Sequence, residues 1–191
     1  MTLVRPPALE RGDVIVREGP FTVAERDAIA EDGYRHELLD GVLVMSPAPR
    51  RRHQSIVLAL AIDLRGAVPP DLQVIVAPFD LRLGERTAFQ PDILVVRRAD
   101  VTEEALRVAP VLAVEVHSPS TRTFDLGPKK ELLAAAGCPS YWTIDPAGPE
   151  LTVWSLDGDT FTRTRAVAAQ ETWTATVPFA VTITPQDLLD D

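Results

Sequence analysis

Apolar side chains recur along this sequence with the two periods that distinguish helices from strands. Between about residues 51 and 67 they fall at Ile56, Leu60 and Leu64, with smaller apolar residues beside them, which is the spacing of one helix face. A pair of prolines follows directly and cannot continue a helix. The pattern therefore predicts one long amphipathic helix that packs its apolar stripe on a core.

The segment before that helix has two local signals. Thr22 followed by Glu25 matches a capping box, which predicts a short helix from there to about Asp32. The run HELL, then Asp40-Gly41, then VLVM predicts a β-hairpin around a type I′ turn. Residues 1–20 have several prolines and no period, so they are expected to form an irregular arm ahead of a single domain over residues 21–191.

Strands dominate the remainder of the chain. Residues 92–96 (DILVV) and 111–117 (VLAVEVH) are nearly continuous apolar runs, as expected of strands buried on both faces. A helix is predicted from Leu126 to Ala136, where Gly137 ends it. Shorter strands are predicted at residues 73–76, 79–83, 140–145, 151–155 and 160–166. The order of elements indicates an α/β (α+β) fold in which helices flank a central mixed β-sheet.

Composition and charge narrow the functional classes. The net charge of −9 argues against a protein that binds nucleic acid through a broad basic face. Much of the acidity, however, lies after residue 144, away from the apolar strands. No apolar run approaches the roughly 20 residues that span a bilayer, and the first residues lack the apolar core of a secretory signal. With Cys138 as the single cysteine, the sequence predicts a cytoplasmic protein without a membrane segment or disulfide.

Two acidic residues interrupt the most apolar strands. Asp92 begins one strand directly after Pro91, and Glu115 lies inside VLAVEVH. An ionised carboxylate in such a strand costs several kcal/mol unless it is paired or binds a metal. Two ordinary explanations stay open: Glu115 could meet an arginine near the end of its strand, and Pro-Asp is a common turn.

Two lysines open the helix that follows. Pro128 is tolerated only in the first helical turn, so Lys129 and Lys130 lie near the helix N-terminus. A cation there opposes the helix dipole. Either one lysine faces a carboxylate cluster or a phosphate, or the pair is simply solvated.

Four stretches together resemble a known family. HELLDGVLVMSP, QPDILVV, VEVHSPSTRTFDLGPKK and AAGCPSYWTIDP occur in the order and spacing of the Uma2-like endonucleases, which have the restriction-endonuclease-like PD-(D/E)xK fold. The resemblance covers about residues 20–185. It implies that Asp92 and Glu115 bind a metal and that Glu37 and Lys129 belong to the catalytic site. Asp125 and Tyr141 also match positions of the family, and the resemblance assigns them no role.

Two histidines lie near these motifs. In the general PD-(D/E)xK class the residue two beyond the Glu is the catalytic lysine, and this chain has His117 there. Strand alternation puts His117 on the same face as Glu115, so it could be a ligand, a base or a tolerated substitution, of which we favour the last. His53 ends the basic run RRRH, for which a solvated helix start is the preferred interpretation over contact with phosphate.

These residue types suit phosphodiester hydrolysis. Mg²⁺ or Mn²⁺ prefers oxygen ligands, and a lysine beside the attacking water stabilises the developing charge. The sequence therefore predicts an Mg²⁺-dependent (or Mn²⁺-dependent) DNA endonuclease that acts as a homodimer. The alternative is a catalytically inactive PD-(D/E)xK domain that binds nucleic acid or another protein, and the overall acidity favours it.

Overall fold

Two mixed β-sheets of six strands each form the framework of this computed structural model, which describes residues 14–189. The central sheet has the strand order β12-β11-β10-β9-β7-β4. Its strands are β4 (Leu72–Val76), β7 (Ile93–Arg97), β9 (Leu112–Val116), β10 (Ser140–Asp145), β11 (Glu150–Asp157) and β12 (Thr160–Val167). The pair β9–β10 is parallel and the other pairs are antiparallel, so the predicted central mixed sheet is confirmed.

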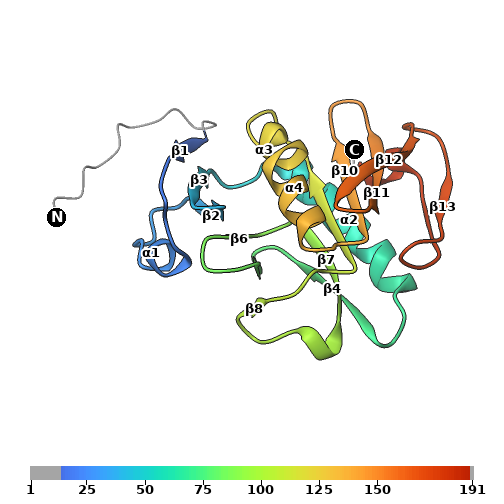
Figure 1. Ribbon diagram of the computed structural model, residues 1–191. Coiled ribbons are helices and arrows are strands. Elements are labelled where there is room, and N and C mark those ends of the chain that lie inside the picture. Colours follow the sequence, from blue (N-terminus) through green and yellow to red (C-terminus); the bar gives the residue numbers. More distant parts are fainter. Residues whose placement is uncertain (1–13, 190–191) are drawn as a thin grey trace.

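A second sheet lies beside the central sheet and has the order β1-β3-β2-β6-β5-β8. Its strands are β1 (Ile15–Arg17), β2 (Arg35–Leu39), β3 (Val42–Ser46), β5 (Asp80–Arg82), β6 (Ala88–Phe89) and β8 (Ala105–Leu106). Strands β2 and β3 form the predicted hairpin, and both Asp40 and Gly41 have the positive φ that a type I′ turn requires. The hairpin lies at one end of the molecule, where Figure 1 draws it in blue.

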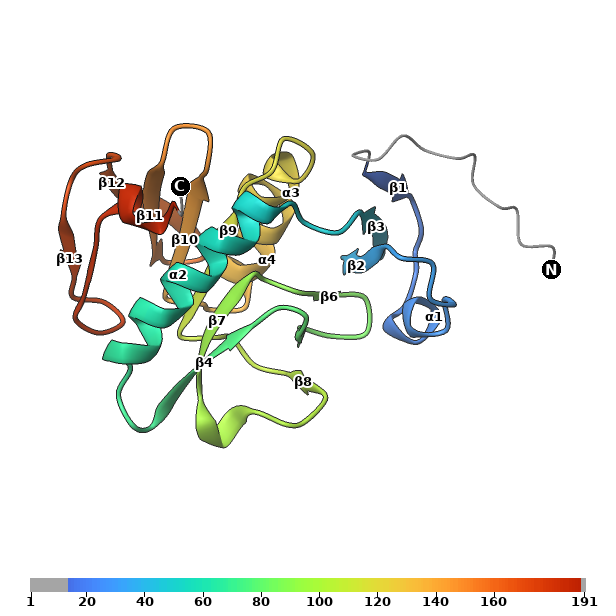
Figure 2. The same cartoon turned by 180° about the vertical axis from the view of Figure 1, so that it is seen from behind.

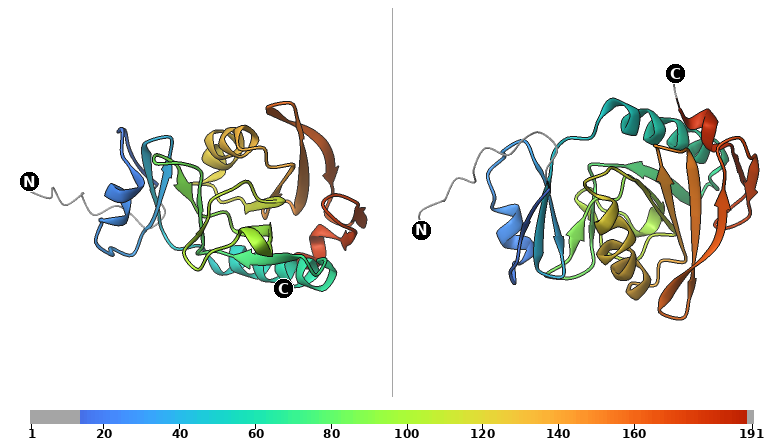
Figure 3. Two further views of the ribbon diagram at one scale, coloured as in Figure 1. Left: turned by 60° about the horizontal axis from the view of Figure 1, so that its bottom comes forward. Right: turned by 90° about the horizontal axis from the view of Figure 1, so that it is seen from above.

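Helices cover both faces of the central sheet. The long helix α2 (Arg51–Ala67) packs on one face, and α3 (Arg122–Leu126) with α4 (Pro128–Ala135) lies on the other, as Figures 2 and 3 show. The remaining elements are α1 (Val23–Asp27), the hairpin of β13 (Trp173–Ala175) and β14 (Val181–Ile183), and the 3₁₀ turns Arg98–Asp100 and Pro185–Leu188. None of the helices within residues 14–189 is long and apolar enough to cross a membrane.

Side chains alternate along β7 and β9, so these strands contribute to two hydrophobic clusters, one on each face of the central sheet. Ile93 and Val114 pack in the cluster that contains the α2 stripe. Leu94 and Ala113 pack in a cluster with α4 and residues of the second sheet. Because side chains alternate across a strand, Glu115 points to the same side as Ala113. The acidic side chain therefore faces α4 and the second sheet, not α2.

Three expectations need correction. The predicted helix over residues 126–136 is two helices, α3 and α4, because Gly127 leaves the helical conformation ahead of Pro128. The helix that follows the confirmed capping box of Thr22 and Glu25 ends at Asp27 and does not reach Asp32. Residues 15–17 of the predicted irregular arm form β1, because the outer edge of β3 offers its backbone for pairing. Residues 1–13 lie outside the described residues.

Candidate active site

Asp92 and Glu115 lie opposite each other on neighbouring strands. Strands β7 and β9 are antiparallel, with Ile93 paired to Val114, so the next step of this register places Asp92 opposite Glu115. Opposite residues of an antiparallel pair point to the same face of the sheet. The Asp92 carboxylate accepts a hydrogen bond of 2.9 Å from the main-chain N–H of Val116, which fixes it beside β9. The two acidic residues therefore lie on neighbouring strands and point to one face of the central sheet.

Lys129 reaches into this acidic cluster from the first turn of α4. Its Nζ donates to Oε1 of Glu115 at 3.0 Å and lies 3.0 Å from Oε2 of Glu37. Oδ1 of Asp125, one helical turn earlier, is 3.5 Å away. The side chain of Lys129 is only 2% exposed. These anions compensate the unfavourable position of the cation at the start of the helix.

Glu37 brings the second sheet into the site. It lies on β2, where its Oε1 accepts a hydrogen bond of 2.9 Å from the main-chain N–H of Gln90, and its Oε2 faces Lys129. The four residues that the sequence assigned to the site, Glu37, Asp92, Glu115 and Lys129, are therefore gathered from two sheets and one helix.

Asp92 has two further partners that sequence reasoning missed. Nε2 of His53, in the first turn of α2, is 3.0 Å from Oδ2 of Asp92. Nη1 of Arg35, on β2, is 3.6 Å from Oδ1. The solvated helix start preferred for His53 is wrong, because the histidine continues the apolar stripe of α2 at Ile56 and Val57 toward the sheet. Two signals for these residues were available in the sequence. One is the stripe of α2, and the other is the strand alternation that puts Arg35 on the same face of β2 as Glu37.

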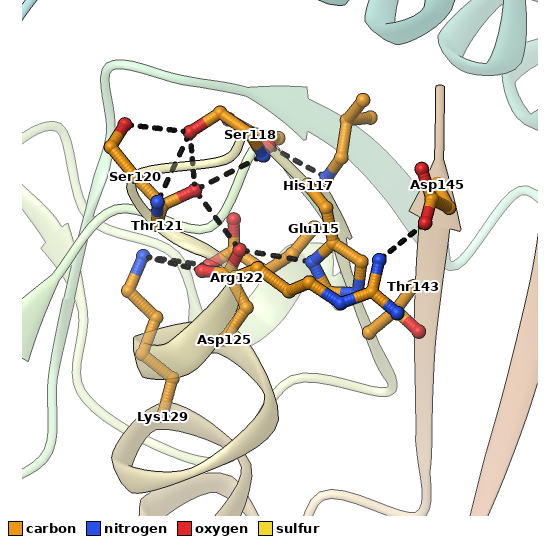
Figure 4. A network of polar contacts seen from close by, with 12 residues as sticks. Glu115, His117, Ser118, Ser120, Thr121, Arg122, Asp125, Lys129, Thr143 and Asp145 are labelled. Atoms are coloured by element: carbon orange, nitrogen blue, oxygen red, sulfur yellow. Dashed lines mark hydrogen bonds and ion pairs between the residues drawn. The ribbon is translucent and has the colours of Figure 1, made fainter. Parts of the chain in front are cut away.

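His117 and Asp125 form a second polar layer next to the cluster (Figure 4). Nδ1 of His117 is 3.1 Å from Oδ2 of Asp125, which also accepts a hydrogen bond of 3.2 Å from the hydroxyl of Thr121. The hydroxyl of Tyr141 donates to the main-chain carbonyl of Asp125 at 3.0 Å. His117 thus fixes the Asp125 carboxylate, which in turn faces Lys129. Asp125 and Tyr141, to which the sequence assigned no role, therefore make contacts that support the site.

The two lysines of α4 have different surroundings. Lys129 is buried in the site, whereas Nζ of Lys130 lies 3.5 Å from the ring centroid of Trp154, a cation–π contact. Lys130 therefore points away from the site and packs on an aromatic ring of β11, so the two lysines are not simply a solvated pair.

Burial and charge set the protonation of these groups. Burial is the largest influence on Glu115 and, with the nearby Asp125, Asp92 and Glu37, raises its pKa well above the usual value despite Lys129. Burial disfavours the charged form of Asp92 as well, but His53, Arg35 and the N–H of Val116 outweigh it and hold its pKa below the usual range. For Lys129 the surrounding carboxylates outweigh burial and raise its pKa, so the ammonium stays charged.

A pocket of about 260 Å³ opens onto these groups, which we call the site pocket. Glu37, Asp92, Glu115 and Lys129 lie in its wall, each between 2% and 3% exposed. The start of α2 supplies Arg50, Arg52 and His53, and the loop before α3 supplies hydroxyl groups. Those hydroxyl groups belong to Ser118, Ser120 and Thr121. The pocket thus combines buried carboxylates with cationic and hydroxyl groups at its sides.

The donor set fits a divalent cation. Asp92 and Glu115 offer hard carboxylate oxygens on one face of adjacent strands, which is the ligand type that Mg²⁺ and Mn²⁺ prefer. The four carboxylates of the cluster exceed the charges of Lys129 and Arg35 that face them, so a divalent ion would balance the excess. Within residues 14–189 no three His, Cys, Asp or Glu side chains form a ready-made metal cage. The arrangement suits an ion that keeps several waters, as Mg²⁺ does.

Comparisons with known proteins bear on the family and the fold of this chain. The model of the Uma2 family, described as "Putative restriction endonuclease", matches residues 23–186. A crystal structure of a "putative nuclease belonging to DUF820" from Anabaena variabilis ATCC 29413 has a TM-score of 0.74 and 20% sequence identity. The match covers 88% of this chain and 97% of that chain, and the expected nuclease fold is thereby confirmed. The comparison with curated proteins finds no match.

Proposed function

Because this chain belongs to the Uma2 family of restriction-endonuclease-like proteins, we propose that it is a divalent-metal-dependent endonuclease that hydrolyses phosphodiester bonds of DNA. One observation carries the proposal: Asp92, Glu115 and Lys129 meet in the wall of one pocket. Burying several like charges together is costly unless a cation and a substrate use them. The resemblance described from the sequence assigns the same residues to the site.

In this proposal each side chain has a distinct part. Asp92 and Glu115 hold Mg²⁺ or Mn²⁺, and when bound the ion supplies an activated water and neutralises charge on the phosphate. Lys129, kept protonated by its neighbours, donates a hydrogen bond toward the reacting phosphate and stabilises the charge that develops there. Glu37 fixes the direction of the Lys129 ammonium, since its other oxygen is held by the backbone of Gln90.

His53 and Arg35 act on the metal-binding carboxylate. Both lie against Asp92, one toward each of its oxygens. They keep Asp92 ionised and fix its orientation, which a ligand to a hard cation requires. The carboxylates of the cluster still outnumber Lys129 and Arg35, so a net negative charge remains for the metal to balance.

The alternative function is a module that binds nucleic acid or protein without cleaving it. The net charge of −9 favours this alternative. Titration calorimetry with Mn²⁺ separates the two, because a module without catalysis needs no metal site. The nuclease proposal expects one binding event that is lost in Asp92→Asn, whereas a binding module gives no heat that depends on Asp92.

The proposal is tested on circular DNA, which has no ends for an exonuclease. Single-stranded circles and supercoiled plasmid are incubated with the purified protein and Mg²⁺ or Mn²⁺, with a chelator in the control. We expect linear or nicked products only when the metal is present. Intact circles of both kinds under all metal conditions would contradict the nuclease function.

A further inference from the structure

We propose, building on the nuclease function, that the site takes an unpaired DNA strand in preference to an intact duplex. In this proposal one nucleoside of that strand lies in a second pocket beside Asp92. The arguments concern the depth of the site, the neighbouring pocket and the polar atoms in its wall.

The reactive groups are buried in the wall of a small pocket. Glu37, Asp92, Glu115 and Lys129 are each no more than 3% exposed and line the site pocket of about 260 Å³. This volume is below the roughly 300–1,000 Å³ of ordinary ligand pockets. A phosphate of an intact duplex enters such a pocket with its base pairs still attached, and bending the duplex toward the site costs deformation energy. An unpaired strand can bend its backbone into the pocket.

A second pocket, of about 600 Å³, adjoins the site pocket and is called the side pocket here. Arg35, His53 and Asp92 line both pockets, so the metal-binding carboxylate is part of the boundary between them. Tyr34 and His36 of the hairpin also line the side pocket. A strand whose phosphate lies in the site pocket would therefore have its adjacent nucleoside within reach of an aromatic ring and an imidazole.

Two buried ring nitrogens in the wall of the side pocket have no hydrogen-bond partner among the described residues. One is Nδ1 of His53, whose Nε2 faces Asp92. The other is Nε2 of His36, which is 3.4 Å from the Asp32 carboxylate without forming a hydrogen bond. Unpaired bases offer donors and acceptors on exposed edges and stack on aromatic rings, whereas paired bases have those edges occupied. The lining of the side pocket thus combines an aromatic ring with imidazoles whose buried ring nitrogens no described residue engages.

The charge distribution agrees with this substrate. A protein that holds a duplex along its length needs many phosphate contacts, and this chain has a net charge of −9. The cationic groups that line the site pocket, among them Arg50 and Arg52, are local. Proteins that bind single strands combine locally placed cationic groups with aromatic side chains on which bases stack.

The test measures binding apart from cleavage. Fluorescence anisotropy is recorded with the full chain in the presence of a chelator, using one labelled oligonucleotide either alone or annealed to its complement. We expect the single strand to bind about tenfold more tightly or better, the equivalent of one stacked base. Equal or tighter binding of the duplex would overturn the inference, even if the protein cleaves DNA.

A matched pair of variants tests the side pocket itself. Tyr34 and Phe21 both pack against the same small cluster of Leu38, Leu43 and Met45, but Phe21 lines neither pocket. Tyr34→Leu should raise the dissociation constant for the single strand about tenfold, whereas Phe21→Leu should leave it unchanged. Equal effects of the two variants would overturn the assignment of the side pocket.

Cleavage is then measured separately with Mg²⁺ on the same two substrates. Preferred cleavage of the single strand supports the inference, and cleavage of both at equal kcat/KM contradicts it. If the protein binds single strands preferentially but cuts neither substrate, the nuclease function fails while the binding inference stands.

Discussion

Lys129 and Lys130 are adjacent in the sequence, yet their surroundings have little in common. Lys129 is buried among Glu115, Glu37 and Asp125, and Lys130 packs over Trp154. Successive helical residues differ by about 100° in direction, so only one of a pair can face the site. The family pattern was sufficient to choose Lys129.

Neutral variants of these lysines provide the clearest test at the scale of single residues. Lys129→Met should lower kcat for DNA cleavage by a factor on the order of 10²–10³, since a hydrogen-bond donor to the transition state is lost. Lys130→Met should change kcat little, because its ammonium lies outside the site. Rates are measured under single-turnover conditions, with thermal melts to confirm folding. Similar losses in the two variants would mean that Lys129 has no specific part.

Sequence reasoning identified the site residues whose chemical type is rare at their position in the predicted fold. An acid inside the run VLAVEVH and an acid at the head of DILVV are costly in buried strands, so Glu115 and Asp92 could be inferred. Arg35 and His53 are ordinary residues for a strand end and a helix start. Spacing gives the face of the helix or strand on which each lies, but their contacts with Asp92 depend on how α2 and the hairpin pack, which spacing does not give.

At the scale of elements, the long and strongly periodic segments were predictable, and the short ones were not. Helix α2 and the hairpin of β2 and β3 have the predicted limits within a residue or two. Strands β6 and β8 have two residues each, which is too short for a period to appear. The second sheet, which delivers Glu37 and Arg35, was therefore missed as a unit although its hairpin was recognised.

A buried ion pair joins α1 to this second sheet. Arg26 of α1 contacts Asp80 of β5, and their side chains are 6% and 9% exposed. Burial alone would raise the pKa of Asp80, but Arg26, Gln90 and Arg82 together lower it. A lowered folded-state pKa means that the stabilisation is present above the unfolded pKa of about 3.9 and is lost as the pH falls through the folded pKa.

Replacing Asp80 should therefore matter at neutral pH and much less in acid. Asp80→Asn should lower the free energy of unfolding at pH 7 by roughly 3 kcal/mol, as for one partner removed from a buried pair. In urea denaturation from pH 7 to pH 3, the difference between the wild type and the variant should stay constant down to about pH 4 and shrink below it. Asp40→Asn is the control, because the Asp40–Arg86 pair is on the surface and contributes less than about 1 kcal/mol. A constant difference between wild type and Asp80→Asn across this pH range would contradict the account.

At the scale of the whole molecule, assembly stays a prediction. Strand β12 is an edge of the central sheet, and an edge strand offers unpaired backbone groups to another chain. Two-fold dimers are the commonest closed assemblies, so we expect a homodimer. Light scattering at micromolar concentration should give about twice the 20.9 kDa of one chain. A mass of one chain across that concentration range would contradict this expectation.

The whole-molecule view also explains how an acidic protein can be a nuclease. The negative charge is partly the charge of the site itself, where four carboxylates face Lys129 and Arg35. The site pocket is small, and in our proposal DNA binding depends on local contacts in two adjoining pockets and not on a basic surface. These two properties favour a metal cofactor and a flexible substrate.

The most direct test of the central claim is the rate of metal-dependent cleavage in Glu115→Gln. This variant keeps the size of the side chain but removes a metal-binding charge, while Lys129 keeps its contact with Glu37. With circular single-stranded DNA and saturating Mg²⁺, we predict that single-turnover cleavage falls by at least about 10²-fold, the scale of a lost transition-state interaction. Melting temperature and preference for the single strand should stay close to those of the wild type. Cleavage by purified Glu115→Gln at the wild-type rate would contradict the assignment of Asp92, Glu115 and Lys129 as the active site.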